Sequence, residues 1–339
     1  MTDRYFKHIL LAEIGEEGQK KLSGASAVVA GCGGLGTVIA NSLVRFGVGK
    51  VTIVDRDFIE LDNLSRQILF DEEDIRRGLP KAIAAAEKLR LINSEITVEP
   101  VVADLTAENI EQIIKGAGIV LDGTDNFETR FLINDACVKL GIPWIYGGVV
   151  ATYGMSFAII PGETPCLKCF ITELPGPGST PTCDTVGVLG TAVNMVASIE
   201  VTEALKIILG KQEALIKKLI YLDVWYGTWS LFELKKEDKR CPVCDDRQFA
   251  FLEQKKGTRL ATLCGQNAVQ VSPPAATGVS FKDLASRLAS SGDVSYNDYM
   301  LRFTIEPYEF TVFPNGRTII KGTTDESAAK TLFAKYIGV

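Results

Sequence analysis

Apolar runs alternate with amphipathic stretches through the first half of the chain. Five runs of mainly apolar residues are typical of buried strands: residues 27–30, 51–54, 96–102, 119–121 and 144–146. Between them, residues 81–91 and 128–140 repeat apolar positions at the spacing of a helix. Strands that alternate with helices predict an α/β fold of the Rossmann-like, doubly wound class, with a mostly parallel sheet.

The pattern changes in the second half of the chain. Residues 186–209 predict one long helix that ends at Gly210. Farther on, the pattern predicts a helix, two strands and a closing helix, at residues 281–289, 299–303, 309–313 and 325–336, with a Pro-Asn-Gly hairpin turn after the second strand. We therefore predict an α/β domain over residues 1–246 and a small α+β domain over residues 247–339.

The charge balance argues against nucleic-acid and membrane partners. The 339 residues include 36 basic and 42 acidic side chains, a net charge of −6 without long blocks of one sign. The longest uncharged run, residues 140–162, contains Pro143 and several glycines, so we interpret it as strands and turns. No basic segment followed by an apolar one opens the chain, and we expect no DNA or membrane partner and a cytoplasmic location.

Histidine and cysteine usage narrows the chemistry. His8 is the single histidine, which excludes a histidine-rich metal site and disfavours a histidine triad. In a reducing compartment, the eight cysteines are more often metal ligands or nucleophiles than disulfides. Candidate chemistry must therefore come from cysteines and charged side chains.

A glycine-rich turn follows the first predicted strand. Gly31, Gly33, Gly34 and Gly36 lie between that strand and a helix, and the next strand ends at Asp55. Such glycines let a phosphate approach the helix N-terminus, and the carboxylate can accept hydrogen bonds from a ribose. By itself the turn favours an NAD-dependent or flavin oxidoreductase. The chain has no Tyr-x-x-x-Lys pair to donate a proton, so that class remains a disfavoured alternative.

Charged residues that suit phosphates follow the turn. Arg66, Lys81 and Asp125 lie after the second strand, at the start of a helix and at the end of a strand. Arg and Lys neutralise phosphate oxygens, and a carboxylate at a strand end can hold Mg²⁺. The alternative is that Arg66 and Lys81 are solvated surface charges and that Asp125 caps a helix.

Several motifs occur in the order of a known family. They are the glycine turn, Asp55, Asn63-Leu64-Ser65-Arg66-Gln67, Pro80-Lys81, Thr124-Asp125-Asn126, Cys166-Leu167-Lys168-Cys169, Thr182-Cys183 and Cys241-Pro242-Val243-Cys244. With them, the first 246 residues resemble the MoeB/ThiF/HesA branch of the ubiquitin-activating-enzyme-like superfamily. The resemblance implies an adenylyltransferase that uses ATP to activate the C-terminal glycine of a small ubiquitin-like sulfur carrier ending in Gly-Gly. It also implies pyrophosphate release and a homodimer.

The resemblance assigns roles to individual residues. Asp55 would hold the ribose; Asn63, Arg66 and Lys81 the triphosphate; Asp125 the Mg²⁺ ion; and Gln67 and Asn126 would line the same ATP site. The attacking carboxylate is ionised at neutral pH, so no general base is needed. Family members usually carry Arg-Tyr-x-Arg-Gln near the start, and the second Arg reaches the neighbouring subunit's triphosphate. Here Lys7 takes that place, with the charge but without the bidentate fork.

The cysteines divide into three groups. Cys166, Cys169, Cys241 and Cys244 form two Cys-x-x-Cys pairs, a donor set for tetrahedral Zn²⁺; a redox dithiol is the alternative for either pair. The resemblance also implies a structural zinc ion at these four residues. The remaining cysteines include Cys32 and Cys137, which we interpret as packing residues, and Cys183.

Cys183 follows a Gly- and Pro-rich stretch and precedes the predicted long helix. A thiol near a helix N-terminus on an irregular loop ionises readily and is accessible, which favours a nucleophile. In the family a cysteine at this position can attack the activated carrier; the alternative is a small helix-cap residue. We hypothesise that Cys183 is dispensable for adenylation but needed for a covalent carrier adduct.

Other functions remain open from the sequence. One is adenylation of a different carboxylate, such as a peptide tail or a modified tRNA base. Another is a non-catalytic nucleotide-binding role. Residues 247–339 resemble no catalytic module, and we expect them to dock a partner or to support a dimer.

Overall fold

The computed structural model describes residues 4–176, 181–234, 240–253, 259–263, 267–273 and 278–338. Parts of the Gly- and Pro-rich stretch before Cys183 and of the charged stretch before Cys241 lie outside this range. The chain divides into two compact units, Met1–Gln254 and Lys255–Val339. Phe249 is buried in the core of the first unit, so the chain continues in that unit for some residues beyond position 246.

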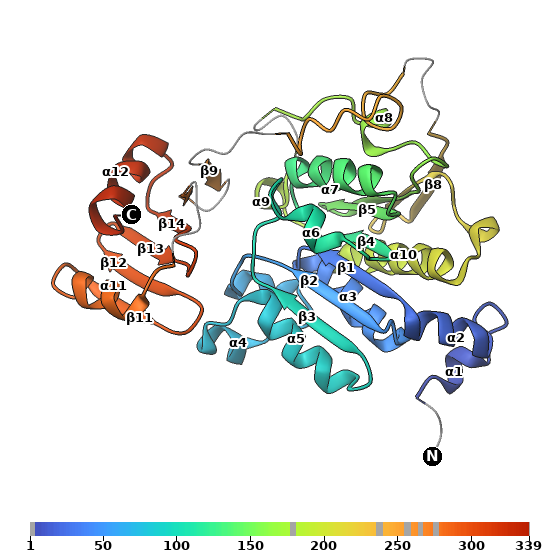
Figure 1. Ribbon diagram of the computed structural model, residues 1–339, viewed down its shortest axis with the longest axis horizontal. Coiled ribbons are helices and arrows are strands. Elements are labelled where there is room, and N and C mark those ends of the chain that lie inside the picture. The colour runs from blue at the N-terminus through green and yellow to red at the C-terminus, as the bar shows by residue number, and fades with distance from the viewer. Residues whose placement is uncertain are drawn as a thin grey trace. The chain divides into compact units, whose positions relative to one another are not determined.

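The first unit is built on an eight-stranded sheet (Figure 1). In the order β3-β2-β1-β4-β5-β6-β7-β8, its strands are Thr97–Val101, Lys50–Val54, Ser26–Ala30, Ile119–Asp122, Trp144–Val150, Tyr153–Ile159, Leu219–Asp223 and Thr228–Phe232. The first five strands are parallel, and β6, β7 and β8 continue the sheet in antiparallel pairs. The predicted Rossmann-like, mostly parallel α/β class is confirmed.

Helices cover both faces of this sheet. They are α1 (Phe6–Ile9), α2 (Gly15–Gly24), α3 (Gly34–Phe46), α4 (Glu72–Arg77), α5 (Lys81–Ile92), α6 (Ile110–Ile114), α7 (Phe127–Leu140), α8 (Leu167–Phe170), α9 (Cys183–Val186) and α10 (Gly190–Leu209), with short 3₁₀ helices at Leu61–Ser65 and Gln212–Ala214. Figure 1 shows α3, α5 and α10 on one face and α6 and α7 on the other. Strands β1 and β4 are buried on both faces, which explains their unbroken apolar sequences.

One predicted helix is shorter than expected. The helix predicted over residues 186–209 begins at Gly190, because the chain is extended between α9 and α10. Gly187 has φ of +78°, and Val188 forms a parallel β-bridge with Ala151. These features separate Cys183 from the long helix; the helix N-terminus at which Cys183 lies is that of the short helix α9.

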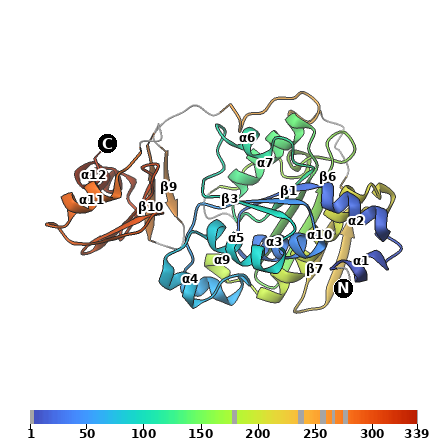
Figure 2. The ribbon, with the colours of Figure 1, turned by 60° about the horizontal axis from the view of Figure 1, so that its bottom comes forward.

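The second unit is a small α+β fold, as predicted. Its six strands form an antiparallel sheet in the order β11-β12-β13-β14-β10-β9: Asp293–Tyr296, Leu301–Ile305, Tyr308–Val312, Thr318–Lys321, Ala268–Ser272 and Arg259–Leu263. Helices α11 (Phe281–Leu288) and α12 (Glu326–Tyr336) pack on the core of this sheet (Figure 2). Phe303 and Phe310 lie opposite each other on β12 and β13 and are fully buried there.

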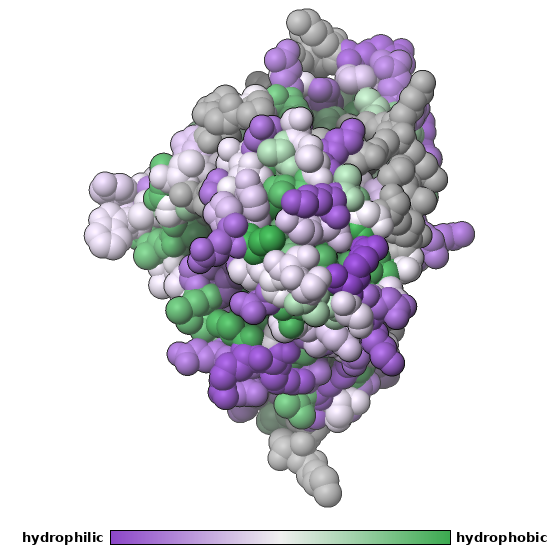
Figure 3. Space-filling view, turned by 90° about the vertical axis from the view of Figure 1, so that its left-hand side faces the viewer, coloured by the Kyte–Doolittle hydropathy of each residue, from purple (hydrophilic) through white to green (hydrophobic). Residues whose placement is uncertain are grey.

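Among the described residues, no helix is both long enough and apolar enough to cross a membrane. On the side of the molecule seen in Figure 3, hydrophobic and hydrophilic residues are interspersed.

Candidate nucleotide site and cysteine cluster

The glycine turn between β1 and α3 is packed tightly on its inner side. Gly31 has φ of +89°, and a Cβ there would lie 2.6 Å from the carbonyl oxygen of Gly123. A Cβ on Gly36 would lie 2.0 Å from the Gly31 carbonyl oxygen. At Gly33, by contrast, a Cβ would meet nothing closer than 3.9 Å. The turn therefore presses against the end of β4 and leaves room at Gly33, where a phosphate could approach the start of α3.

Asp55 ties the glycine turn to the loop after β2. One carboxylate oxygen accepts a hydrogen bond from the backbone N–H of Cys32 at 2.6 Å, and the other accepts one from the N–H of Asp57 at 2.6 Å. Burial raises the pKa of Asp55, and the nearby Lys81 charge acts in the opposite direction. Each oxygen keeps a lone pair that can accept a hydrogen bond from a ribose hydroxyl.

Lys81 is buried at the first position of α5. Its Nζ lies 4.0 Å from an Asp57 carboxylate oxygen. Burial disfavours the charged amine, but the carboxylates of Asp57, Asp55 and Asp125 outweigh that effect and raise the pKa of Lys81. Lys81 is thus a sequestered cation with acidic neighbours, and the alternative of a solvated surface charge does not describe it.

Asp125 and Asn126 form the turn between β4 and α7. The side chain of Asn126 accepts a hydrogen bond from the Thr129 N–H at 2.9 Å and caps α7, so the cap is Asn126 and not Asp125. The Asp125 carboxylate is exposed at the carboxyl edge of the parallel strands. Ligands of open α/β sheets bind at this edge, and an exposed carboxylate there can hold Mg²⁺.

Residues of the Leu61–Ser65 helix and the turn after it complete this edge. Asn63 is buried and donates to the Asp62 carboxylate at 3.0 Å. An ideal Cβ on Gly34 would contact the Arg66 side chain at 3.8 Å, and one on Gly33 would lie 4.0 Å from the Gln67 amide nitrogen. The Gln67 amide oxygen is buried without a hydrogen-bond partner among the described residues. Arg66 and Gln67 therefore lie beside the glycine turn, where the Arg66 guanidinium donates to the Asp62 carbonyl oxygen at 2.9 Å.

Two further residues organise the site and were missed by sequence reasoning. Asp122, at the end of β4, accepts hydrogen bonds from Thr124 and from Arg130 Nε, the latter at 2.8 Å. Arg130 Nη2 also donates to the carbonyl oxygens of Thr124 (2.8 Å) and Gly147 (2.9 Å). This buried ion pair holds the turn that carries Asp125. The available signal was a charged residue at the end of an otherwise apolar strand.

Lys7 is not part of this arrangement within one chain. Its helix α1 follows directly after Tyr5. The Tyr5 ring packs so closely against Gly47, at the far end of α3, that it would collide with a Cβ there. The Tyr5 hydroxyl accepts a hydrogen bond from Asn93 at 2.8 Å. His8 stacks on Phe46, also at that end, with ring centroids 4.6 Å apart. The 13 residues of α3 span roughly 20 Å, which separates Lys7 from the glycine turn of its own chain.

The four predicted ligand cysteines lie together. The Sγ atom of Cys166 lies 3.8 Å from that of Cys169 and 3.7 Å from that of Cys241. The Sγ atoms of Cys169 and Cys244 are 3.6 Å apart. All four sulfur atoms lie within 4.8 Å of one another. A tetrahedral metal with bonds of about 2.3 Å separates its sulfur ligands by about 3.8 Å, so the cluster fits such an ion. Two independent redox pairs would not require this convergence.

Cys183 lies apart from that cluster, on the four-residue helix α9. Thr182 caps this helix through a reciprocal capping box with Thr185. The Cys183 thiol is 3.4 Å from the carbonyl oxygen of Val149 on β5, in position to donate to it.

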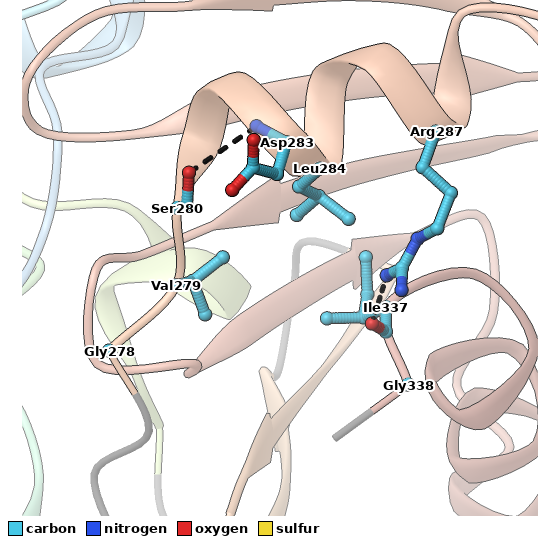
Figure 4. Close-up of a pocket in the computed structure, with 8 residues that line it drawn as sticks. All are labelled: Gly278, Val279, Ser280, Asp283, Leu284, Arg287, Ile337 and Gly338. Carbon is cyan, nitrogen blue, oxygen red and sulfur yellow. Dashed lines mark hydrogen bonds between the residues drawn. The ribbon is translucent and has the colours of Figure 1, made fainter.

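A separate cavity of about 280 Å³ lies in the second unit, at the start of α11 (Figure 4). Ser280 caps α11 beside it, and Arg287 donates to the Ile337 carbonyl oxygen at its rim. None of the site residues expected from the sequence lines this cavity.

Fold and site together define a nucleotide-binding α/β protein with a four-cysteine cluster. Residues 5–243 match the ThiF family model, and the chain belongs to the ThiF family. It is 42% identical over 341 residues to the sulfur carrier protein ThiS adenylyltransferase of Bacillus subtilis (strain 168), with 100% of each chain covered. It is 38% identical over 244 residues to the SAMP-activating enzyme E1 of Haloferax volcanii, covering 72% of this chain and 89% of the relative.

Solved structures agree with this relationship. The structure of E. coli MccB with ATP superposes with a TM-score of 0.61 at 25% identity, covering 72% of this chain and 74% of that one. The matches confirm both the predicted MoeB/ThiF branch and the predicted adenylyltransferase class. The Bacillus subtilis relative matches along the whole chain, second unit included, whereas the Haloferax relative does not.

Proposed function

We propose that this protein adenylates the C-terminal glycine of a ubiquitin-like sulfur carrier of the ThiS kind, one that ends in Gly-Gly. The observation that carries the proposal is the buried Lys81 with its acidic neighbours beside the glycine turn, in a chain that matches a ThiS adenylyltransferase from end to end.

The residues divide the work as follows. A carboxylate oxygen of the carrier attacks the α-phosphorus of ATP, a P–O bond forms, and the bond to the departing pyrophosphate breaks. Negative charge grows on the phosphate oxygens, and Arg66 and Lys81 stabilise it. Asp125 would hold Mg²⁺, which would neutralise the same oxygens. Asp55 would orient the ribose, Asn63 would contact the triphosphate together with Arg66 and Lys81, and Gln67 and Asn126 would line the ATP site.

The cysteine cluster supports a structural zinc ion. Its four sulfur atoms leave no position open for substrate in a tetrahedral ion. The ion would join α8 to the segment that starts at Cys241. The backbone N–H of Cys241 donates a hydrogen bond to the Asp245 carboxylate at 2.8 Å. The second unit would dock a partner or support a dimer; loss of carrier affinity on removal of residues 255–339 would support that role.

A homodimer would bring Lys7 to a nucleotide site. Lys7 lies at the end of α3 that is far from its own glycine turn, so it can serve only the site of another subunit. Its amine would then supplement Arg66 and Lys81 on the triphosphate.

The edge strand β8 offers a surface for a protein substrate. It forms one edge of the eight-stranded sheet, and its Trp229, Leu231 and Phe232 are 50%, 47% and 52% exposed. Exposed apolar edge strands are usually protected or paired, and a carrier with a β-sheet edge could pair with this one. We assign the surface to the carrier because the enzymes that this chain resembles act on carrier proteins.

ATP–pyrophosphate exchange tests the proposal. We expect exchange with a ThiS-type carrier that ends in Gly-Gly and none with the same carrier lacking its last glycine. Exchange that is absent with every such carrier but present with a short peptide or another carboxylate would contradict the proposal.

A further inference from the structure

A buried carboxyl group lies behind the candidate nucleotide site. Glu200, in the middle of α10, is 0% exposed; the Asp122 backbone N–H faces its carboxyl group, but neither carboxyl oxygen has a hydrogen bond of ordinary geometry among the described residues. Helix α10 packs against β4 and β5, the strands that carry Asp122 and Gly147. A Cβ on Gly147 would lie 2.0 Å from Glu200 Oε1, so the carboxyl group presses directly on the backbone of β5.

One cation faces two acids in this part of the core. Arg130 on α7 already donates to Asp122 at 2.8 Å and to the Gly147 carbonyl oxygen at 2.9 Å. Asp122 is therefore the acid that the arginine pairs with. The groups that face Glu200 across these elements are Asp122 of β4, Arg130 of α7 and Tyr146 of β5.

An ionised Glu200 would be a second buried anion without a cation of its own. Burying an unpaired charge is costly, and the group takes up a proton instead. Burial, followed by the charge of Asp122, raises the pKa of Glu200 well above its usual range. Geometry and charge balance thus agree that the carboxyl group is neutral.

We propose that Glu200 is a positioning residue of the nucleotide site and that it works as a neutral acid. Its carboxyl group supports Gly147 from behind and leaves Arg130 available to hold Thr124, the residue before Asp125. Loss of the proton would place a carboxylate beside Arg130 and divide the guanidinium between two acids. The grip on Thr124 and Gly147 would weaken, and the Asp125 turn would lose its support.

The consequence is a loss of nucleotide affinity at high pH. This inference rests on the proposed function for its kinetic part. The adenylation chemistry supplies no alkaline loss of its own, since the attacking carboxylate is ionised and the pKa of Lys81 is raised by its acidic neighbours. The alkaline change therefore belongs to the Glu200 proton.

The test compares Glu200→Gln with wild type, because Gln has the same shape as the neutral acid and cannot ionise. In pyrophosphate exchange from neutral pH to the most alkaline pH at which wild type remains folded, we expect the wild-type KM for ATP to rise about tenfold or more, with kcat changing less. Glu200→Gln should keep the low-pH KM throughout. Glu203→Gln, a matched change of a buried acid paired with Lys206 on the same helix, should keep the wild-type rise. Identical pH profiles for wild type and Glu200→Gln would overturn the proposal.

A second measurement needs no carrier and separates this inference from the proposed function. A raised pKa means that stability is present at low pH and lost as pH rises through the folded-state pKa. We expect the melting temperature of wild type to fall below that of Glu200→Gln at alkaline pH, and calorimetric binding of MgATP to weaken only in wild type. Equal melting temperatures and equal MgATP affinities across the pH range would contradict the inference. If Glu200→Gln does not fold, Glu200→Met carries the same expectations.

Discussion

The pKa of an individual charged side chain in this protein depends on its burial and on the charges of its neighbours. Lys81 is buried and yet its pKa is raised, because the carboxylates of Asp57, Asp55 and Asp125 outweigh the cost of burial. Such a cation is fixed before ATP arrives and needs little reorganisation when charge develops on the phosphates.

Replacement of Lys81 by Ala should lower kcat/KM for pyrophosphate exchange by about 10²–10³-fold, since one preorganised charge stabiliser is lost. Steady-state exchange assays measure this effect. Lys20→Ala, which removes an exposed lysine paired with Glu17, is the control and should leave kcat/KM unchanged. Equal activity of the two variants would show that Lys81 does not contact the triphosphate.

The raised pKa of Asp135 predicts that the stability of the fold, rather than catalysis, depends on pH. It is fully buried on α7, accepts the Phe251 N–H at 3.0 Å, and burial raises its pKa from 3.8 to about 6. The fold therefore favours the protonated acid: this contribution is complete below about pH 4 and is lost as pH rises through about 6. At about 1.4 kcal/mol per pKa unit, it amounts to at most about 3 kcal/mol.

Urea unfolding of Asp135→Asn at a series of pH values measures this contribution. The variant should lack the decline in unfolding free energy between about pH 4 and pH 7 that wild type shows. Asp298→Asn, at an exposed position, should follow wild type. A decline of the same size in Asp135→Asn would place the effect elsewhere.

Sequence reasoning found the residues with recognisable motifs and missed those defined by burial. Asp55, Arg66, Lys81 and the four cysteines stand in patterns that depend on spacing along the chain. Asp122 and Arg130 do not, because an arginine in an amphipathic helix looks the same in sequence whether it faces water or a buried carboxylate.

At the scale of elements, the candidate nucleotide site lies at the carboxyl ends of the parallel strands, and the proposed carrier surface lies on the edge strand β8. The parallel strands bring their carboxyl ends, and with them Asp55 and Asp125, to one edge. The antiparallel extension ends in β8, which is exposed on both faces. The predicted strands were found because buried parallel strands have distinctive apolar runs. The long helix was predicted too long because its sequence does not reveal that Val188 pairs with Ala151.

The assignment of β8 to the carrier predicts a selective effect. Trp229→Ser should raise the KM for the carrier about tenfold and leave the KM for ATP unchanged, because it removes one aromatic anchor from the docking edge. Leu91→Ser, at the 88% exposed Leu91 of α5, is the matched control and should change neither value. An unchanged KM for the carrier in the Trp229 variant would contradict the assignment of the β8 surface to the carrier.

The cysteine cluster predicts a loss of metal and stability together. Cys244→Ala should abolish stoichiometric zinc and lower the unfolding free energy by several kcal/mol, because a closed tetrahedral site loses a ligand. Elemental analysis and thermal unfolding measure both effects. Cys183→Ala, which lies outside the cluster, should retain zinc. A wild-type protein without zinc would contradict the assignment.

At the scale of the whole molecule, one chain does not bring every expected residue to its site. Lys7 lies at the wrong end of α3 for its own nucleotide site, and only a second subunit could correct this. A mixture of Lys7→Ala and Lys81→Ala chains tests the point. Each variant alone should be weakly active, but a mixed dimer contains one site with both lysines, so about a quarter of the sites should recover. No recovery in mixtures shown to contain mixed dimers would exclude the trans role.

The second unit extends the match with the Bacillus subtilis relative to the full chain, and this full-length match is what points to a ThiS-type carrier. The most direct test of that central claim is the intact mass of the carrier after incubation with enzyme and MgATP. We predict that the carrier gains one AMP on its terminal glycine while ATP releases an equal amount of pyrophosphate. A carrier whose mass is unchanged while exchange proceeds with a different carboxylate would contradict the account.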